Sequence, residues 1–160
     1  MNLLVIGYGN TLRCDDGVGP KAAEAVAAFN LPGARVISCQ QLTPELAEPI
    51  AKAGVVVFID ASMDVADHVE WRPVPAQNAG EGTTHASSPS GLLMLAQQAF
   101  GRQPPAWMVA IPVQDMGIGE RLSARAAAGV QAAAAQIKAF SCRRSRRAKT
   151  PQNCFTDTLR

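Results

Sequence analysis

Three side chains that can bind a metal ion or transfer a proton lie close to predicted strands and helices of this chain. Asp16 comes shortly after an apolar run at residues 3–6, and Asp60 directly follows a second apolar run at residues 55–59. His85 lies at the end of a glycine-rich loop, ahead of a predicted helix. Two carboxylates and a neutral imidazole form a mixed oxygen and nitrogen donor set, which suits a borderline divalent ion and leaves positions open for a substrate or water.

Each of these residues also has a plain structural interpretation. Asp16 stands just before Gly17, where the chain enters a helix, so its carboxylate can serve as an N-cap. Asp60 can satisfy the turn that follows its strand. His85 can be a solvated loop residue. The local sequence leaves both interpretations open for each residue. The three side chains can form one site only if the fold brings them close together.

The strands that would position these residues follow from the apolar pattern. Residues 3–6 and 55–59 are apolar on both faces and rich in branched side chains, which is typical of the centre of a parallel sheet. Residues 34–40 and 106–113 are predicted to form two further strands. Residues 68–75 alternate and carry prolines, which predicts an edge strand. We expect it to run antiparallel to its predecessor, because the loop before it is too short for a crossover helix.

Four predicted helices alternate with these strands. The first begins near Pro20, and the second begins at Pro44 with Thr43 as its N-cap. The third covers residues 90–100 and the fourth residues 120–140. The resulting order, β-α-β-α-β-β-α-β-α, predicts a three-layer α/β/α sandwich around a mostly parallel five-stranded sheet with one antiparallel edge strand. In such a fold the two acids and the histidine can meet at one edge of the sheet.

The glycines and acids that follow the first strand form a long pattern. Residues 7–19 read Gly-Tyr-Gly-Asn-Thr-Leu-Arg-Cys-Asp-Asp-Gly-Val-Gly. A dinucleotide-binding fingerprint fails here, because Leu12 stands at its third glycine position. The pattern instead resembles the signature of the hydrogenase maturation endopeptidases. The resemblance covers roughly residues 1–140 and includes a His-x-x-x-Pro element at residues 85–89.

That resemblance implies a metal-dependent endopeptidase that removes the C-terminal extension from the large-subunit precursor of a nickel-containing hydrogenase, once nickel has been inserted. The nickel would be carried by the substrate, and other divalent ions could occupy the site in the isolated protein. The residues implied to be catalytic and to contact the metal are Asp16, Asp60 and His85. Those implied to shape the floor of the substrate cleft are Gly7, Gly9 and Asn10.

No conventional nucleophile is evident in the sequence. Cys14 has no histidine beside it, and neither Ser87 nor Ser88 lies in a glycine elbow. Attack by water, with a bound ion polarising the scissile carbonyl, is therefore the favoured chemistry. Two other functions stay open: a non-catalytic nickel checkpoint or chaperone on the same site, and another hydrolase on the same scaffold, such as one acting on peptidyl-tRNA.

Composition and charge limit the class of protein. A chain of 160 residues with 48% apolar and 18% charged residues predicts one folded domain. Beyond Phe140 lie six basic residues and one acid, so the rest holds nine basic and twelve acidic residues, a formal charge of −3. We therefore expect an α/β domain at residues 1–140, a basic and disordered tail at residues 141–160, and no nucleic-acid partner.

The cysteines and the amino terminus predict the compartment. The chain has four cysteines without a Cys-x-x-Cys pair, so reduced thiols are expected. No basic segment precedes the first apolar run, which is too short for a signal peptide or a membrane span. We expect a cytoplasmic monomer that does not associate with a membrane.

Overall fold

The computed structural model describes residues 2–65, 67–75 and 87–149. Its elements alternate in the predicted order, and one-turn 3-10 helices at Cys14–Gly17 and Pro44–Leu46 precede the first two α-helices. The strands are β1 Leu3–Tyr8, β2 Ala34–Cys39, β3 Val55–Ser62, β4 Glu70–Pro73 and β5 Ala106–Pro112. The helices are α1 Val18–Ala27, α2 Ala47–Lys52, α3 Pro89–Phe100 and α4 Ala124–Lys149.

The five strands form one sheet in the order β2-β1-β3-β5-β4. All neighbouring pairs are parallel except β4 and β5, in which Glu70 lies opposite Ala110. The prediction of a mostly parallel sheet with one antiparallel edge strand is therefore confirmed. The edge strand β4 pairs with β5 and not with β3, the strand that precedes it in sequence. The reason is that β3 is already flanked on both sides by the longer strands β1 and β5.

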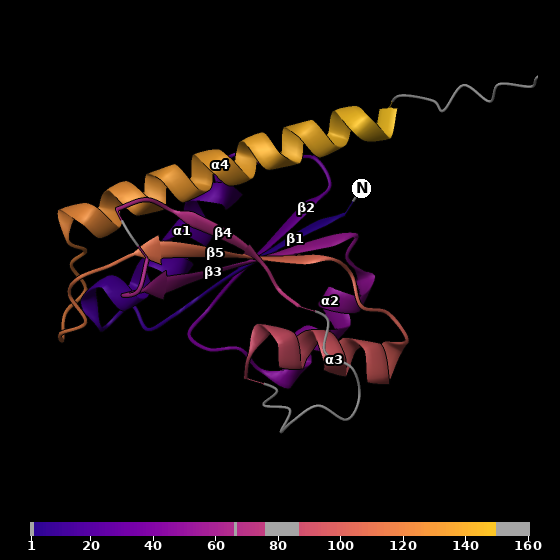
Figure 1. Ribbon diagram of the computed structural model, residues 1–160, viewed down its shortest axis with the longest axis horizontal. Coiled ribbons are helices and arrows are strands. Elements are labelled where there is room, and N and C mark those ends of the chain that lie inside the picture. The colour runs from indigo at the N-terminus through magenta and orange to yellow at the C-terminus, as the bar shows by residue number, and fades with distance from the viewer. Residues whose placement is uncertain (1, 66, 76–86, 150–160) are drawn as a thin grey trace, which may run out of the picture.

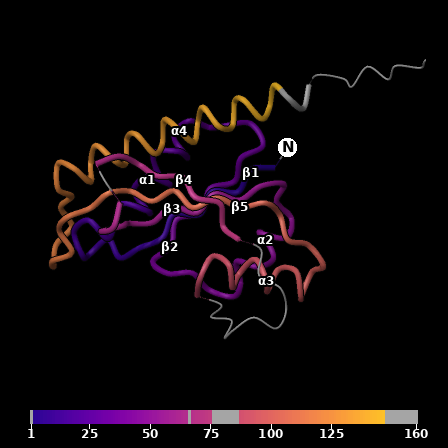
Figure 2. The backbone as a smooth tube through the Cα atoms, viewed as in Figure 1, coloured from indigo at the N-terminus to yellow at the C-terminus, as the bar shows by residue number. Residues whose placement is uncertain are grey.

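The helices cover both faces of the sheet, with α1 and α4 on one face and α2 and α3 on the other (Figure 1). The backbone trace shows the same three layers (Figure 2). Successive residues of a strand point to opposite faces. In β1, Leu3 and Val5 belong to the core under α1 and α4, whereas Leu4 and Ile6 belong to the core under α2 and α3. This is why the central strands are apolar at every position.

Helix α4 starts later and ends later than predicted. It begins at Ala124 and continues to Lys149, so its end projects beyond the sheet (Figure 1). The prediction of disorder is wrong for residues 141–149, because Ala, Arg and Lys extend an existing helix readily even without apolar anchors. Residues 150–160, the rest of the predicted tail, lie outside the described residues.

The start of α2 differs from the prediction. Thr43 makes no capping hydrogen bond through its side chain, and Pro44 opens a 3-10 turn instead of the predicted α-helix. Within the described residues, no helix is both long and apolar enough to cross a lipid bilayer.

Candidate functional site

The loop after β1 holds Asp16 at the carboxyl edge of the sheet. The Asp16 carboxylate accepts a hydrogen bond from the backbone N–H of Asn10 at 2.8 Å, and the Asn10 side chain accepts one from the N–H of Leu12 at 2.9 Å. Gly9 has a φ of +143°, and a Cβ there would overlap the Asp16 carbonyl oxygen. The N-cap of α1 is Gly17, without a side-chain bond. Asp16 is therefore not a helix cap, and its side chain fastens the loop.

Asp60 lies near the carboxyl end of β3, as predicted, although the strand continues for two more residues to Ser62. Its carboxylate accepts a hydrogen bond from the N–H of Ala61 at 2.8 Å. Burial raises the pKa of Asp60, and the negative charge of Asp16 raises it further, while the Tyr8 hydroxyl and the Ala61 N–H oppose this. Asp16 is thus close enough for its negative charge to disfavour the charged form of Asp60.

Tyr8 ends β1 beside Asp60. Gly7 pairs with Ile59 in the parallel register, so Tyr8 and Asp60 are the next residues of the two strands and point to the same face. The Tyr8 hydroxyl lies within hydrogen-bonding reach of the Asp60 carboxylate. Burial, followed by the Asp60 charge, raises the pKa of Tyr8. Tyr8 therefore stays protonated and can donate to Asp60. The sequence analysis missed this contact, although the strand register could have indicated it.

Asp15, the neighbour of Asp16, is fully buried. Its carboxylate accepts the N–H groups of Gln114 and Asp115, both at 3.0 Å, and both the N–H and the hydroxyl of Ser123 at 2.7 Å. Burial favours the neutral acid, but these hydrogen bonds outweigh it and hold the pKa of Asp15 below its ordinary value. The Ser123 hydroxyl also accepts the N–H of Ala126 at the start of α4. Asp15 thus joins the loop after β1 to the loop after β5 and to α4.

The same two loops are joined through Cys14. Its N–H donates to the carbonyl of Gly119 at 2.6 Å, and the Gly119 N–H donates to the carbonyl of Leu12 at 2.9 Å. Cys14 has a φ of +45° and Gly119 one of +148°, both in the region that costs free energy for ordinary residues. Burial and the neighbouring Asp115 carboxylate raise the pKa of the Cys14 thiol. Cys14, Cys39 and Cys142 are free, as predicted, and Cys154 lies outside the described residues.

Two glycines of the signature permit α1 to approach the sheet closely. A Cβ on Gly7 would overlap the Gly19 carbonyl, and a Cβ on Gly19 would overlap the backbone of Tyr8 and lie 2.7 Å from the Ile59 carbonyl oxygen. The start of α1 is therefore pressed between the ends of β1 and β3. This contact sets the position of the loop that carries Asp16.

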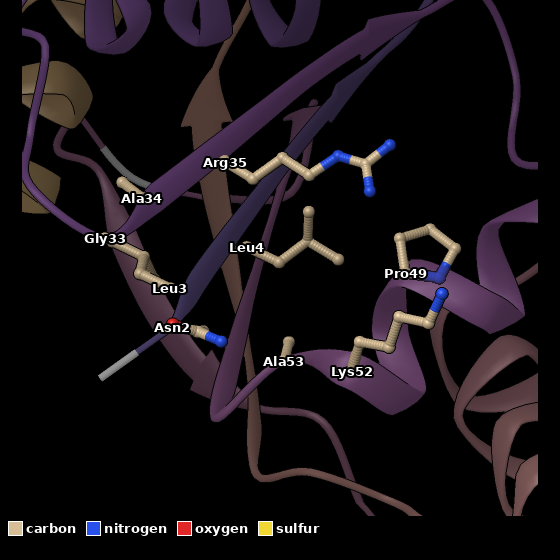
Figure 3. A pocket seen from close by; sticks show the side chains of 9 residues that line it. All are labelled: Asn2, Leu3, Leu4, Gly33, Ala34, Arg35, Pro49, Lys52 and Ala53. Atoms are coloured by element: carbon tan, nitrogen blue, oxygen red, sulfur yellow. The ribbon is translucent and has the colours of Figure 1, made fainter.

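A cavity of about 310 Å³ lies beside this loop, between the ends of β1 and β2. Of the three residues predicted to form the cleft floor, Gly9 and Asn10 line this cavity and Gly7 does not. Neither Asp16 nor Asp60 lines it. A second cavity, of about 330 Å³, lies at the opposite, amino edge of the strands, where the side chain of Leu4 points between Arg35 and Lys52 (Figure 3).

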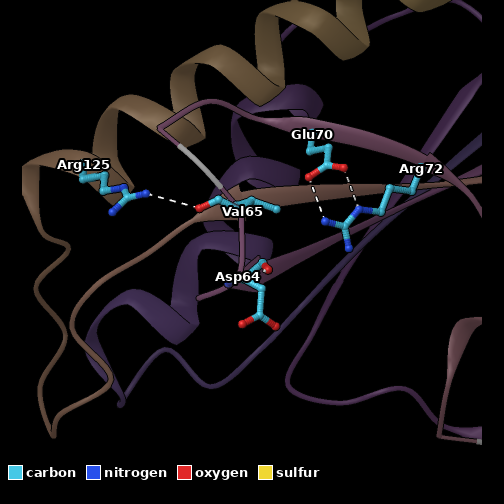
Figure 4. Close-up of polar contacts among 6 residues, drawn as sticks. Asp64, Val65, Glu70, Arg72 and Arg125 are labelled. Atoms are coloured by element: carbon cyan, nitrogen blue, oxygen red, sulfur yellow. Dashed lines mark hydrogen bonds and ion pairs between the residues drawn. The ribbon is translucent and has the colours of Figure 1, made fainter.

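The polar contacts drawn around Asp64, Val65 and β4 do not involve Asp16 or Asp60 (Figure 4). Arg72 forms a two-pronged ion pair with Glu70, at 2.7 and 2.8 Å, and Arg125 donates to the carbonyl of Val65 (Figure 4). None of the contacts drawn there involves the carboxylate of Asp64. The ion pairs found among the described residues leave out both acids of the pair.

The structure thus brings two of the three predicted site residues together. Asp16 and Asp60 flank the point where β1 and β3 lie side by side although β2 separates them in sequence. The connection from β1 to β2 runs through α1 on one face of the sheet, and the connection from β3 to β5 runs through α3 on the other. Open α/β sheets bind ligands at such switch points. His85 lies outside the described residues, and within these residues no three histidine, cysteine or acidic side chains form a group that could hold a metal ion.

Comparison with known proteins finds the same architecture. No family model matches the chain, and no curated protein matches its sequence. A nickel-iron hydrogenase maturation protease from Thermococcus kodakarensis superimposes with a TM-score of 0.68 at 22% identity, over 88% of this chain and 92% of that one. This chain has the fold of the hydrogenase maturation proteases.

Two Escherichia coli structures agree with the match to the maturation-protease fold. The hydrogenase maturating endopeptidase HybD matches with a TM-score of 0.61 at 20% identity, over 91% of this chain and 94% of that one. An endopeptidase matches with a TM-score of 0.68 at 18% identity, over 94% of this chain and its own full length. The expected resemblance is confirmed for the fold.

Proposed function

We propose that this chain is an endopeptidase that removes the C-terminal extension of a hydrogenase large-subunit precursor after nickel insertion, and that it recognises the nickel bound in that precursor. Asp16, Asp60 and His85 would contact the nickel. The observation that carries the proposal is the pair of carboxylates, Asp16 and Asp60, at the switch point of a maturation-protease fold. The solved structures with this fold include named hydrogenase maturation proteases and endopeptidases.

The chemistry of the two acids supports a divalent-ion contact. One oxygen of each carboxylate accepts a backbone N–H, from Asn10 to Asp16 and from Ala61 to Asp60. Hydrogen bonds of this kind fix the direction of metal-binding carboxylates. Two negative charges held close together at a partly buried position repel each other, and a shared cation would relieve that repulsion. Carboxylate oxygens and an imidazole nitrogen suit nickel, a borderline ion.

The environment of Cys14 supports water as the attacking group. The raised pKa of the thiol keeps it protonated near neutral pH, and only the thiolate is a good nucleophile. The nickel in the substrate would polarise the scissile carbonyl, while this chain's carboxylates orient the precursor. A Cys14→Ser variant should therefore still cleave.

The deciding experiment is cleavage of purified precursor. Nickel-loaded and nickel-free precursor are incubated with the protein, and the mass of the released peptide is measured. Release from the nickel-loaded form alone is expected. Equal cleavage of both forms would contradict nickel recognition, and binding without release would favour a non-catalytic checkpoint protein on the same site.

The role of the histidine is tested by replacement. His85→Ala should keep the thermal unfolding midpoint of the wild type and leave nickel-loaded precursor uncleaved. The matched control is His68→Ala, which changes an exposed histidine elsewhere. If His85→Ala cleaves as fast as His68→Ala, the histidine does not belong to the site.

A further inference from the structure

Three large apolar side chains are exposed in loops at the carboxyl edge of the parallel strands. Leu12 follows β1, Met63 follows β3 and Ile118 follows β5, and their exposed fractions are 57%, 61% and 98%. We call these three residues the apolar rim. A single exposed leucine is ordinary on a protein surface, but apolar side chains gathered at one edge are typical of interaction sites.

Hydrogen bonds fix the backbone of the loops that carry two members of the apolar rim, Leu12 and Ile118. The loops that carry Leu12 and Ile118 are joined by the hydrogen bonds among Leu12, Cys14 and Gly119. The Arg13 guanidinium adds a bond to the carbonyl of Met116 at 3.2 Å. The buried Asp15 carboxylate ties both loops to the start of α4. The loops are therefore held in place while these apolar side chains stay in solvent.

One member of the apolar rim, Leu12, belongs to the loop that carries Asp16. Leu12 lines the cavity of about 310 Å³ together with Gly9 and Asn10. It belongs to the same loop as Asp16, whose carboxylate accepts the N–H of Asn10. A partner that presents a cation to the acid pair would therefore also lie near Leu12, and near Ile118 through the hydrogen bonds that join the two loops.

Other exposed aromatic side chains differ from this arrangement. The Lys138 ammonium lies over the ring of Phe29, 4.5 Å from its centroid, so that ring already has a partner. Phe100, which is 50% exposed, ends α3 near the amino edge of the strands. Neither ring shares the carboxyl edge with the acid pair, and Phe100 thus provides a natural control.

We propose that the apolar rim is the docking surface for the nickel-loaded precursor, which would present an apolar patch around its bound nickel. This inference rests on the proposed function. Charge complementarity selects this occupant: the two carboxylates of Asp16 and Asp60 face a partner that carries a divalent cation. Apolar contacts around the ion would exclude water and strengthen the attraction between the carboxylates and the cation.

The test compares Ile118→Ser and Leu12→Ser with the control Phe100→Ser. All three substitutions remove an exposed side chain, so unfolding midpoints close to that of the wild type are expected. With nickel-loaded precursor, Ile118→Ser should raise KM about ten-fold and leave kcat unchanged, because burial of the side chain stabilises only the complex. Leu12→Ser should raise KM in the same way, and Phe100→Ser should leave it at the wild-type value.

The outcomes separate this inference from the proposed function. If the wild type releases no peptide, direct binding to purified nickel-loaded precursor is measured by calorimetry, and weaker binding by Ile118→Ser still supports the docking surface. Equal KM values, or equal affinities, for Ile118→Ser and Phe100→Ser would overturn it. Concentration-dependent dimers that disappear in Ile118→Ser, without any change in KM, would assign the surface to a second copy of the chain and would also overturn it.

Discussion

The two edges of the parallel sheet are built differently. At the carboxyl edge, Asp15 is fully buried and Cys14 and Gly119 have positive φ angles. At the amino edge, an open cavity is bordered by Arg35 and by Lys52, which forms an exposed ion pair with Glu48 at 2.6 Å. The carboxyl edge thus contains a strained backbone position at Cys14 and a buried carboxylate, Asp15, that accepts hydrogen bonds from Gln114, Asp115 and Ser123, whereas the amino edge contains an exposed ion pair. Strained positions persist where function requires them, and the proposed site lies at this edge.

The largest expected effect concerns the acid pair. Asp16→Asn and Asp60→Asn should each reduce cleavage of nickel-loaded precursor by about 100-fold or more, as expected when a preorganised charged group is removed. Cleavage is measured as kcat/KM. The matched control is Asp64→Asn, which neutralises an exposed acid shortly after β3 and should keep full activity. Equal losses in Asp64→Asn would show that net charge matters and that the pair does not.

The next effect is on stability. Asp15→Asn should lower the free energy of unfolding by roughly 3 kcal/mol, because an amide group must point its own N–H donors at the N–H groups that now donate to Asp15. Urea denaturation measures this loss. Glu48→Gln, which removes the exposed ion pair at the amino edge, should leave the midpoint almost unchanged. A stable Asp15→Asn variant would show that the carboxyl edge is not locked by this residue.

Asp15 also makes the protein sensitive to acid. Its hydrogen bonds hold its pKa below the ordinary value despite burial, so the folded state binds the proton less tightly than the unfolded state does. The stabilisation is complete above the unfolded pKa of about 3.9 and is lost as the pH falls through the lower folded value. Urea midpoints of the wild type and Asp15→Asn should therefore converge as the pH is lowered below about 4. A constant difference would contradict the lowered pKa.

The smallest effect has the opposite sign. The raised pKa of Asp60 means that the folded state disfavours its charged form, first through burial and then through Asp16. Wild-type stability therefore falls as the pH rises above the unfolded pKa of about 3.9. Asp60→Asn should be slightly more stable than the wild type at neutral pH, despite its expected loss of cleavage activity, and the difference should vanish in acid. Thermal unfolding across pH checks this, and a less stable variant at neutral pH would contradict it.

The sequence alone determined the framework of the molecule. The apolar runs at residues 3–6 and 55–59 predicted central strands, because only a strand covered on both faces is apolar at consecutive positions. The glycine and acid pattern at residues 7–19 predicted the fold that the solved structures share. The turn chemistry of Asn10 was also predictable, since it depends on residues close in sequence.

Only the tertiary structure distinguished the two adjacent aspartates. Asp15 and Asp16 have identical side chains, yet Asp15 is buried among donors from Gln114, Asp115 and Ser123, about a hundred residues away, while Asp16 lies near Asp60. Periodicity reports which positions are covered, but it does not report which distant groups cover them. For the same reason, the local pattern did not reveal that β4 pairs with β5, because packing decides that pairing. Nor did it reveal that α4 extends beyond Phe140, because an existing helix continues without apolar residues of its own.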